Sequence, residues 1–98
     1  MVTISLSSAD LQSCFASSSK YDKIRFIISG NRIQLDTVAN ASDLTTSFYS
    51  YNNMKNVISK MEINITVKLT FRKDNTIVMN YCWGSYLVES KFFPCPDS

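Results

Sequence analysis

The sequence predicts a single α+β domain over residues 1–98, with its elements in the order β-α-β-β-β-α-β-β-β. We expect a mostly antiparallel sheet with two helices on one face. The 98 residues are 45% hydrophobic, which is enough apolar material for one core and too much for a disordered chain. Most segments alternate apolar and polar residues, as strands do, while two show helical spacing. Helices and strands do not alternate one by one and no glycine-rich phosphate loop occurs, so a nucleotide-binding fold is not expected.

The first strand is predicted from the alternation of Val2, Ile4 and Leu6 with polar residues. A helix follows, capped by Ser7 or Ser8. Its apolar positions fall at helical spacing, at residues 11, 14 and 15, and the serine run 17–19 ends it.

A hairpin is predicted next. Residues 24–29 form a β-rich run, Gly30 and Asn31 supply the turn, and Ile33 and Leu35 alternate with polar residues. After a polar loop over residues 40–43, residues 44–49 are expected to form the third strand of this group.

The second helix has the clearest pattern, because its apolar residues fall at i, i+3, i+4 and i+7: Met54, Val57, Ile58 and Met61. Three strands then complete the chain, over residues 66–72, 77–83 and 86–93, with a turn at 73–75 between the first two. Core-facing strand positions are expected at Leu69, Phe71, Val78 and Tyr81.

Histidine is absent, which removes histidine-based catalysis and histidine-bearing metal sites. The three cysteines, Cys14, Cys82 and Cys95, are too scattered for a metal cage, and their odd number favours reduced thiols. Cys14 and Cys82 are expected to be buried. Three aspartates, at positions 36, 43 and 74, fall at expected turns and are interpreted as turn formers. The sequence therefore predicts a protein that is not an enzyme and carries no cofactor or metal.

The net charge of +2 excludes a strongly basic arm of the kind that binds nucleic acid tightly. No apolar run approaches the length of a membrane span, and the first residues lack the basic start of a signal peptide. We therefore expect a nuclear or cytoplasmic protein with no membrane partner.

The C-terminal third resembles a known family. Residues 66–70 (T-V-K-L-T), Asp74 and residues 77–81 (I-V-M-N-Y) are similar to T-V-T-L-S, a turn aspartate and L-V-V-E-Y at the same spacing in DNA sliding clamps of the PCNA type. Residues 91–96 (K-F-F-P-C-P) resemble the K-Y-Y-L-A-P with which eukaryotic clamps approach their C-terminus. The predicted element order is also that of one clamp domain.

This resemblance implies a non-enzymatic processivity or docking factor that assembles with copies of itself around DNA in replication or repair. A eukaryotic clamp subunit joins two such domains by a long loop, and three subunits close a ring. The present sequence resembles the C-terminal half of a subunit, without that loop. The groove that binds partner peptides in the family is therefore at best half present.

The resemblance also implies candidate residues. Clamp helices meet phosphates without reading bases, which points to Lys20, Lys23, Lys55 and Lys60 for weak, non-specific contact with double-stranded DNA. The alternative is an ordinary solvated helix face. The tail is expected to leave the sheet as an extended strip because of its prolines, and it is the candidate surface for replication or repair proteins: Phe92, Phe93, Pro94, Cys95 and Pro96.

A second hypothesis is an interaction or accessory protein, such as a viral factor, that keeps the clamp fold and binds a protein partner without forming a ring. Under the clamp hypothesis a homo-oligomer is expected, formed by pairing of sheet edges. The segments implied are residues 44–49 on one side and residues 76–83, or the neighbouring strand, on the other.

Overall fold

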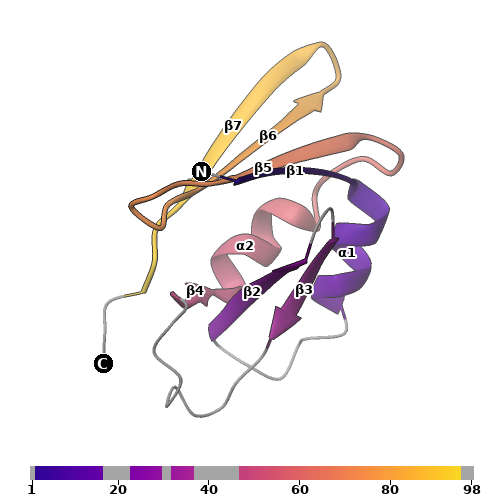
Figure 1. Cartoon of the computed structure of the whole chain (residues 1–98). Helices are drawn as coiled ribbons and strands as arrows, with labels where there is room; N and C mark the ends of the chain where they lie inside the picture. The colour runs from indigo at the N-terminus through magenta and orange to yellow at the C-terminus, as the bar shows by residue number, and fades with distance from the viewer. Residues whose placement is uncertain (1, 17–22, 30–31, 37–46, 96–98) are drawn as a thin grey trace.

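The computed structural model describes residues 2–16, 23–29, 32–36 and 47–95. Its elements follow the predicted order (Figure 1). They are β1 (Val2–Ser7), α1 (Ser8–Ala16), β2 (Lys23–Ser29), β3 (Arg32–Asp36), β4 (Tyr49–Ser50), α2 (Tyr51–Ile58), β5 (Thr66–Phe71), β6 (Ile77–Trp83) and β7 (Tyr86–Phe92). The third strand was expected over residues 44–49. Residues 44–46 lie outside the described residues, and residues 47 and 48 are not in a strand, so the expectation is wrong there and only its last residue falls in β4.

The described strands form two antiparallel sheets, so the expectation of one sheet is wrong. The larger sheet has the order β1-β5-β6-β7 and the smaller has the order β3-β2-β4. Figure 1 shows α1 and α2 on the same side of the larger sheet, and their buried residues join one core with those of β5 and β6. The coarse class is confirmed: an α+β domain with both helices on one face of a four-stranded antiparallel sheet.

The pairing of strands explains why there are two sheets. The chain contains two successive units that each begin with a strand and a helix: β1 and α1 are followed by the hairpin β2–β3, and β4 and α2 are followed by the three strands β5–β7. The strand before each helix pairs with the strand after the other helix, β1 with β5 and β4 with β2. The two units therefore exchange their first strands, and neither unit completes its sheet alone.

A serine side chain caps the N-terminal end of each helix. The Ser7 hydroxyl accepts a hydrogen bond from the Asp10 amide at 3.1 Å, and the Ser50 hydroxyl accepts one from the Asn53 amide at 3.3 Å. Each serine thereby satisfies an amide that the helix leaves unpaired. The predicted cap of the first helix is confirmed at Ser7.

The helices run antiparallel, and side chains of each helix bond to the backbone of the other. The Gln12 amide nitrogen donates to the backbone oxygens of Ile58 (3.1 Å) and Met61 (3.0 Å). Gln12 thereby caps the C-terminal end of α2. The Tyr51 hydroxyl, at the start of α2, donates to the backbone oxygen of Phe15 near the end of α1. Because every donor and acceptor in these contacts is paired, the helix layer can be buried without leaving polar groups unsatisfied.

The core lies between the helix layer and the inner face of the larger sheet. Ile4, Leu69 and Met79 are opposite one another on β1, β5 and β6 and are fully or almost fully buried. The core-facing predictions for Leu69 and Tyr81 are confirmed, and Phe71 is half-buried against the core. Val78 is buried too, at 8% exposed. Since it alternates with Ile77 and Met79, however, it lies on the outer face, so the core-facing expectation is wrong for this residue.

Two tight turns connect β5, β6 and β7. The turn after β5 places Asn75 in the left-handed region (φ 68°), and the Asp74 carboxylate accepts a hydrogen bond from the Thr76 amide at 3.0 Å. This confirms Asp74 as a turn former. The turn after β6 consists of Gly84 and Ser85, with Gly84 at φ 60°. A positive φ at the first of two turn residues matches the hairpin turn that requires glycine there.

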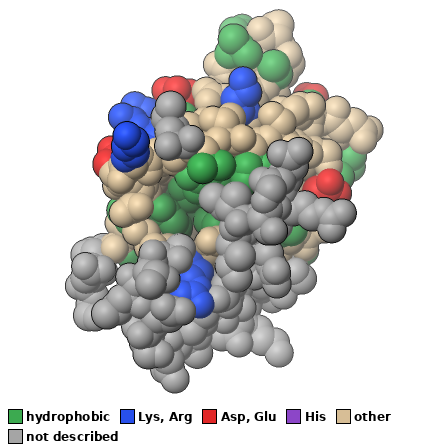
Figure 2. Space-filling view, in the orientation of Figure 1, with side chains coloured by type: hydrophobic (Ala, Val, Ile, Leu, Met, Phe, Trp, Pro, Cys, Tyr) green, Lys and Arg blue, Asp and Glu red, His purple; other side chains and the backbone are tan. Residues whose placement is uncertain are grey.

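The β6–β7 hairpin extends beyond the rest of its sheet. The β5–β6 pairing ends at Lys68–Asn80, whereas the β6–β7 pairing continues to Trp83–Tyr86. Figure 1 shows this end standing apart from β5, and Figure 2 shows hydrophobic side chains gathered on it at the top of the view. Cys82 is exposed here, so the expectation that it is buried is wrong, because it alternates with Tyr81 and lies on the outer face, beyond the end of β5.

A tyrosine of β4 ties the two sheets together and predicts a pH dependence. The Tyr49 hydroxyl donates to the backbone oxygen of Asn75, in the β5–β6 turn. Burial raises the pKa of Tyr49, and the negative charge of Asp74 raises it further. The pKa of Asp74 is itself lowered, first by the hydrogen bond from the Thr76 amide.

A group whose pKa is raised on folding contributes stability that is present below its unfolded pKa, about 10 for tyrosine, and is lost as the pH rises through the folded value. Tyr49→Phe should therefore lower the melting temperature at pH 8 and make it fall less between pH ~9.5 and ~11.5 than in the wild type. Thermal denaturation across this range measures both effects. Parallel pH profiles for the two proteins would rule out a role for this hydroxyl.

Candidate nucleic-acid interface and partner groove

The exposed face of α2 carries two of the four candidate lysines. Met54 and Ile58 lie on the opposite face of the helix and are buried in the core. Lys55, in the last turn of α2, and Lys60, just after it, are exposed to solvent. The Lys55 ammonium lies 5.6 Å from the centroid of the Tyr51 ring. This contact positions the ammonium on the helix surface without neutralising its charge.

The third candidate lies at the other end of α2. Lys23 is exposed at the start of β2, and it pairs with Ser50, the residue that caps α2. Lys20 lies outside the described residues. Lys23 therefore lies near the start of α2, and Lys55 and Lys60 lie near its end, in a helix about 12 Å long at 1.5 Å per residue. No acidic residue occurs between positions 50 and 61. Lysines placed in this way can meet a phosphate backbone but offer no means of reading bases.

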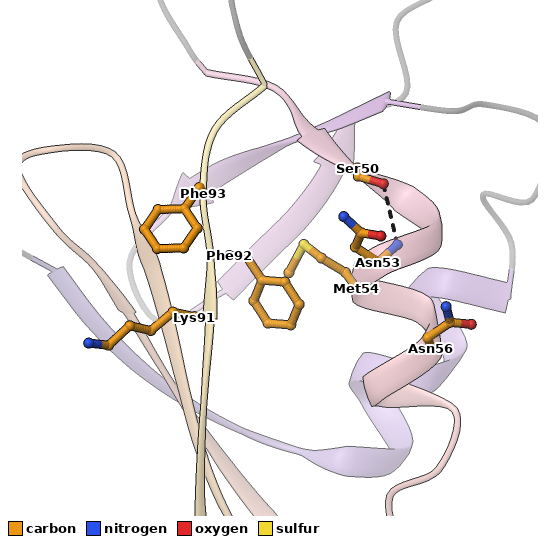
Figure 3. Close-up of a pocket in the computed structure, with 7 residues that line it drawn as sticks. All are labelled: Ser50, Asn53, Met54, Asn56, Lys91, Phe92 and Phe93. Carbon is orange, nitrogen blue, oxygen red and sulfur yellow. Dashed lines mark hydrogen bonds between the residues drawn. The ribbon is translucent and has the colours of Figure 1, made fainter.

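A groove lies between the end of β7 and α2. Its volume is 420 Å³, and Figure 3 shows the residues that line it: Ser50, Asn53, Met54, Asn56, Lys91, Phe92 and Phe93. On the helix side, two asparagines and a serine offer hydrogen bonds beside Met54. On the strand side, Phe92 points toward Met54, whereas Lys91 and Phe93 point away from α2 (Figure 3).

The two neighbouring phenylalanines of the tail have different environments. Phe92 is only 8% exposed and points toward Met54 of α2, whereas Phe93 is 70% exposed and points to the other side of β7 (Figure 3). Consecutive strand residues face opposite sides of a sheet, which is the physical reason. Phe92 is therefore a core residue that only borders the groove, and Phe93 is the exposed aromatic.

The described part of the tail, residues 93–95, leaves β7 without forming a helix, and residues 96–98 lie outside the described residues. The Cys95 amide donates to the Phe48 backbone oxygen at 2.7 Å, and Pro94 and Cys95 are half-buried. Pro96 lies outside the described residues. The tail is thus held against the residue that precedes β4, and of the five predicted partner residues only Phe93 is seen fully exposed.

Two parts of these surfaces escaped the sequence analysis. One is the helix side of the groove. Asn53 and Asn56 are exposed on α2, and the sequence pattern assigned them no role. The outer face of β7 was also missed, although its alternation of exposed residues is a readable signal.

Other chemistry is limited within the described ranges. No group of three metal-ligating side chains gathers there, and Cys14, Cys82 and Cys95 are not joined by disulfides. Burial raises the pKa of Cys14, and the charge of Asp10 raises it further, which keeps this thiol protonated. None of the described helices has the length and apolar character needed to cross a membrane. Comparison with protein-family models, curated proteins and solved structures finds no match to this chain.

Proposed function

We propose that this protein is a non-enzymatic, sliding-clamp-like domain that contacts double-stranded DNA through the exposed face of α2 and assembles with copies of itself in replication or repair. The observation that carries the proposal is the pair of exposed lysines, Lys55 and Lys60, in a segment without acidic residues whose helix has its other face anchored in the core, with Lys23 exposed where β2 pairs with the cap of that helix. The element order, which is that of one clamp domain, supports it.

The proposed contact with DNA is weak. Three lysines give a salt dependence with a slope of about −3 in log K against log salt concentration, which is shallow compared with specific DNA-binding proteins. A single copy would therefore hold DNA poorly. Several copies arranged around a duplex would instead centre it by many weak contacts, while the closed assembly prevents escape.

Retention on circular DNA tests this proposal. The double variant Lys55→Glu/Lys60→Glu should lose about tenfold or more in retention at 50 mM salt, because two of the three phosphate contacts become repulsive. The matched control is Lys68→Glu/Lys73→Glu, which makes the same change of net charge at exposed sites away from α2. It should retain DNA within about twofold of the wild type.

Two results would contradict the proposal. Equal loss in both double variants would mean that only net charge matters, and the absence of retention by the wild type would remove DNA from the proposed function. Circular dichroism of each variant should match the wild type, since all four lysines are exposed.

A second candidate function is binding of a protein partner without a ring. The exposed end of the β6–β7 hairpin favours it, because Trp83, Tyr86 and Leu87 are 45%, 74% and 88% exposed. Aromatic and leucine side chains grouped at a projecting end are typical of interaction surfaces. If the wild-type protein is not retained on DNA at any salt concentration, this candidate becomes the preferred one.

A further inference from the structure

The strand β7 forms one edge of the larger sheet. Among the described residues it pairs only with β6, and the sheet order ends with it. No proline interrupts residues 86–92. An edge of seven residues without such a block presents unpaired backbone donors and acceptors to any strand of matching pattern. The expected edge at residues 76–83 is therefore corrected to its neighbour, since β6 is paired on both sides.

Hairpin geometry decides which residues of β7 use the free edge. In a hairpin with a two-residue turn, the two flanking residues, here Trp83 and Tyr86, form the hydrogen-bonded pair. Antiparallel pairs then alternate between hydrogen-bonded and non-hydrogen-bonded along the ladder. The backbone groups of the even-numbered residues 86–92 thus point to β6, and those of residues 87, 89 and 91 point to the free edge, with residue 93 next in the alternation just after the strand.

These same four residues share the outer face of the sheet, where all are exposed. Leu87 and Phe93, at 88% and 70% exposed, stand at the two ends, and Glu89 and Lys91 lie between them. Figure 3 shows Lys91 and Phe93 on the side of β7 away from α2. The order is apolar, acidic, basic, apolar. Such an order is complementary to itself when a second copy runs antiparallel, because acid meets base and apolar meets apolar.

The charges select one register. Backbone pairing at the free edge requires odd-numbered residues opposite odd-numbered residues. Centring the pair on residue 89 would place two Glu89 carboxylates opposite each other, and centring it on residue 91 would do the same for two Lys91 ammonium groups. Centring it on Ser90 places Glu89 opposite Lys91 twice and Leu87 opposite Phe93 twice. Opposite charges facing each other across strands are favourable and like charges are not.

We propose that two copies of this protein pair through β7, antiparallel and centred on Ser90, to form one eight-stranded sheet across a two-fold axis. This axis is perpendicular to the sheet, so the helices of both copies stay on the same face. The dimer makes no use of α2 and forms independently of any contact with DNA. Its interface is small, so its formation is concentration-dependent.

Charge exchange tests the dimer and its register. Sedimentation equilibrium of the wild type at ~100 μM should show a mass rising toward twice 11.1 kDa, falling on dilution. Glu89→Lys alone and Lys91→Glu alone should each weaken the dimer about tenfold or more, because each places like charges opposite each other twice. An equimolar mixture of the two single variants should recover the dimer, since every pair in the mixed dimer is again Lys opposite Glu. The double variant Glu89→Lys/Lys91→Glu should recover it as well.

Lys68→Glu is the matched control, an exposed charge reversal on the same face but on an interior strand, and it should dimerise like the wild type. Lys55→Glu/Lys60→Glu should do so too, which separates this dimer from the DNA contact. A wild-type mass of 11.1 kDa at ~100 μM would overturn the proposal. Failure of the mixture to recover the dimer would overturn the register.

Discussion

Replacing Phe92 with alanine is expected to lower the free energy of unfolding by about 3–5 kcal/mol, whereas replacing Phe93 should change it by less than about 0.5 kcal/mol. Phe92 pairs with Ile77 in the ladder and fills the space beside Met54, so its removal leaves a cavity between the sheet and α2. Phe93 is exposed on the other side of the strand. Two adjacent phenylalanines are thus predicted to differ severalfold in their contribution to the free energy of unfolding.

Urea denaturation of both variants measures the difference directly, and each variant is the other's control because the chemical change is the same. Phe93→Ala should additionally weaken the β7 dimer by removing two apolar pairs, which Phe92→Ala in folded protein should not. Equal destabilisation by the two substitutions would mean that the tail does not follow the alternation of β7.

The second large effect is expected at Ser8, a fully buried polar residue at the start of α1. Its hydroxyl donates to the Glu62 backbone oxygen at 2.7 Å and accepts from the Ile65 amide at 3.3 Å. It thereby fastens α1 to the segment between α2 and β5. Ser8→Ala leaves both backbone groups without this partner, and each buried group left unpaired costs about 1–3 kcal/mol.

Ser13→Ala is the matched control, because Ser13 lies in the same helix and is exposed. It should be neutral or slightly stabilising, since alanine has the higher helix propensity. For a domain of this size each kcal/mol shifts the melting temperature by about 4–8 °C. Similar melting temperatures for the two variants would show that the Ser8 hydroxyl contributes no more than an exposed one.

The elements of the fold could be predicted from the sequence because their signals are local. The spacing of Met54 and Ile58 defines α2, Asp74 marks a turn, and alternation marks β5 to β7. The pairing of β1 with β5 could not be predicted in this way. Those strands are far apart in the sequence, and alternation indicates that a strand has one buried face without identifying its partner. The division into two sheets follows from that pairing and was missed with it.

The candidate surfaces were predictable to a similar degree. Exposure of Lys55 and Lys60 follows from the helical pattern alone. Phe92 was assigned to the surface together with Phe93, although strand alternation places consecutive residues on opposite faces. Cys82 was expected to be buried because cysteine usually is, but it lies on the outer face of the projecting end of the hairpin. The complementarity of residues 87–93 with a second, antiparallel copy could be recognised only once β7 was known to be an edge strand.

The exchange of first strands between the two units sets the order in which this chain can fold. The hairpins β2–β3, β5–β6 and β6–β7 join neighbouring segments, but β1 joins its sheet only through a pairing in which residue 2 lies opposite residue 71. Folding that depends on such non-local pairing is slow, in the range of milliseconds to seconds. During synthesis, β1 leaves the ribosome long before β5 exists, and its apolar face waits uncovered meanwhile. The nascent chain should therefore remain a client of chaperones until Phe71 has emerged, and its two halves should collapse into the native domain together.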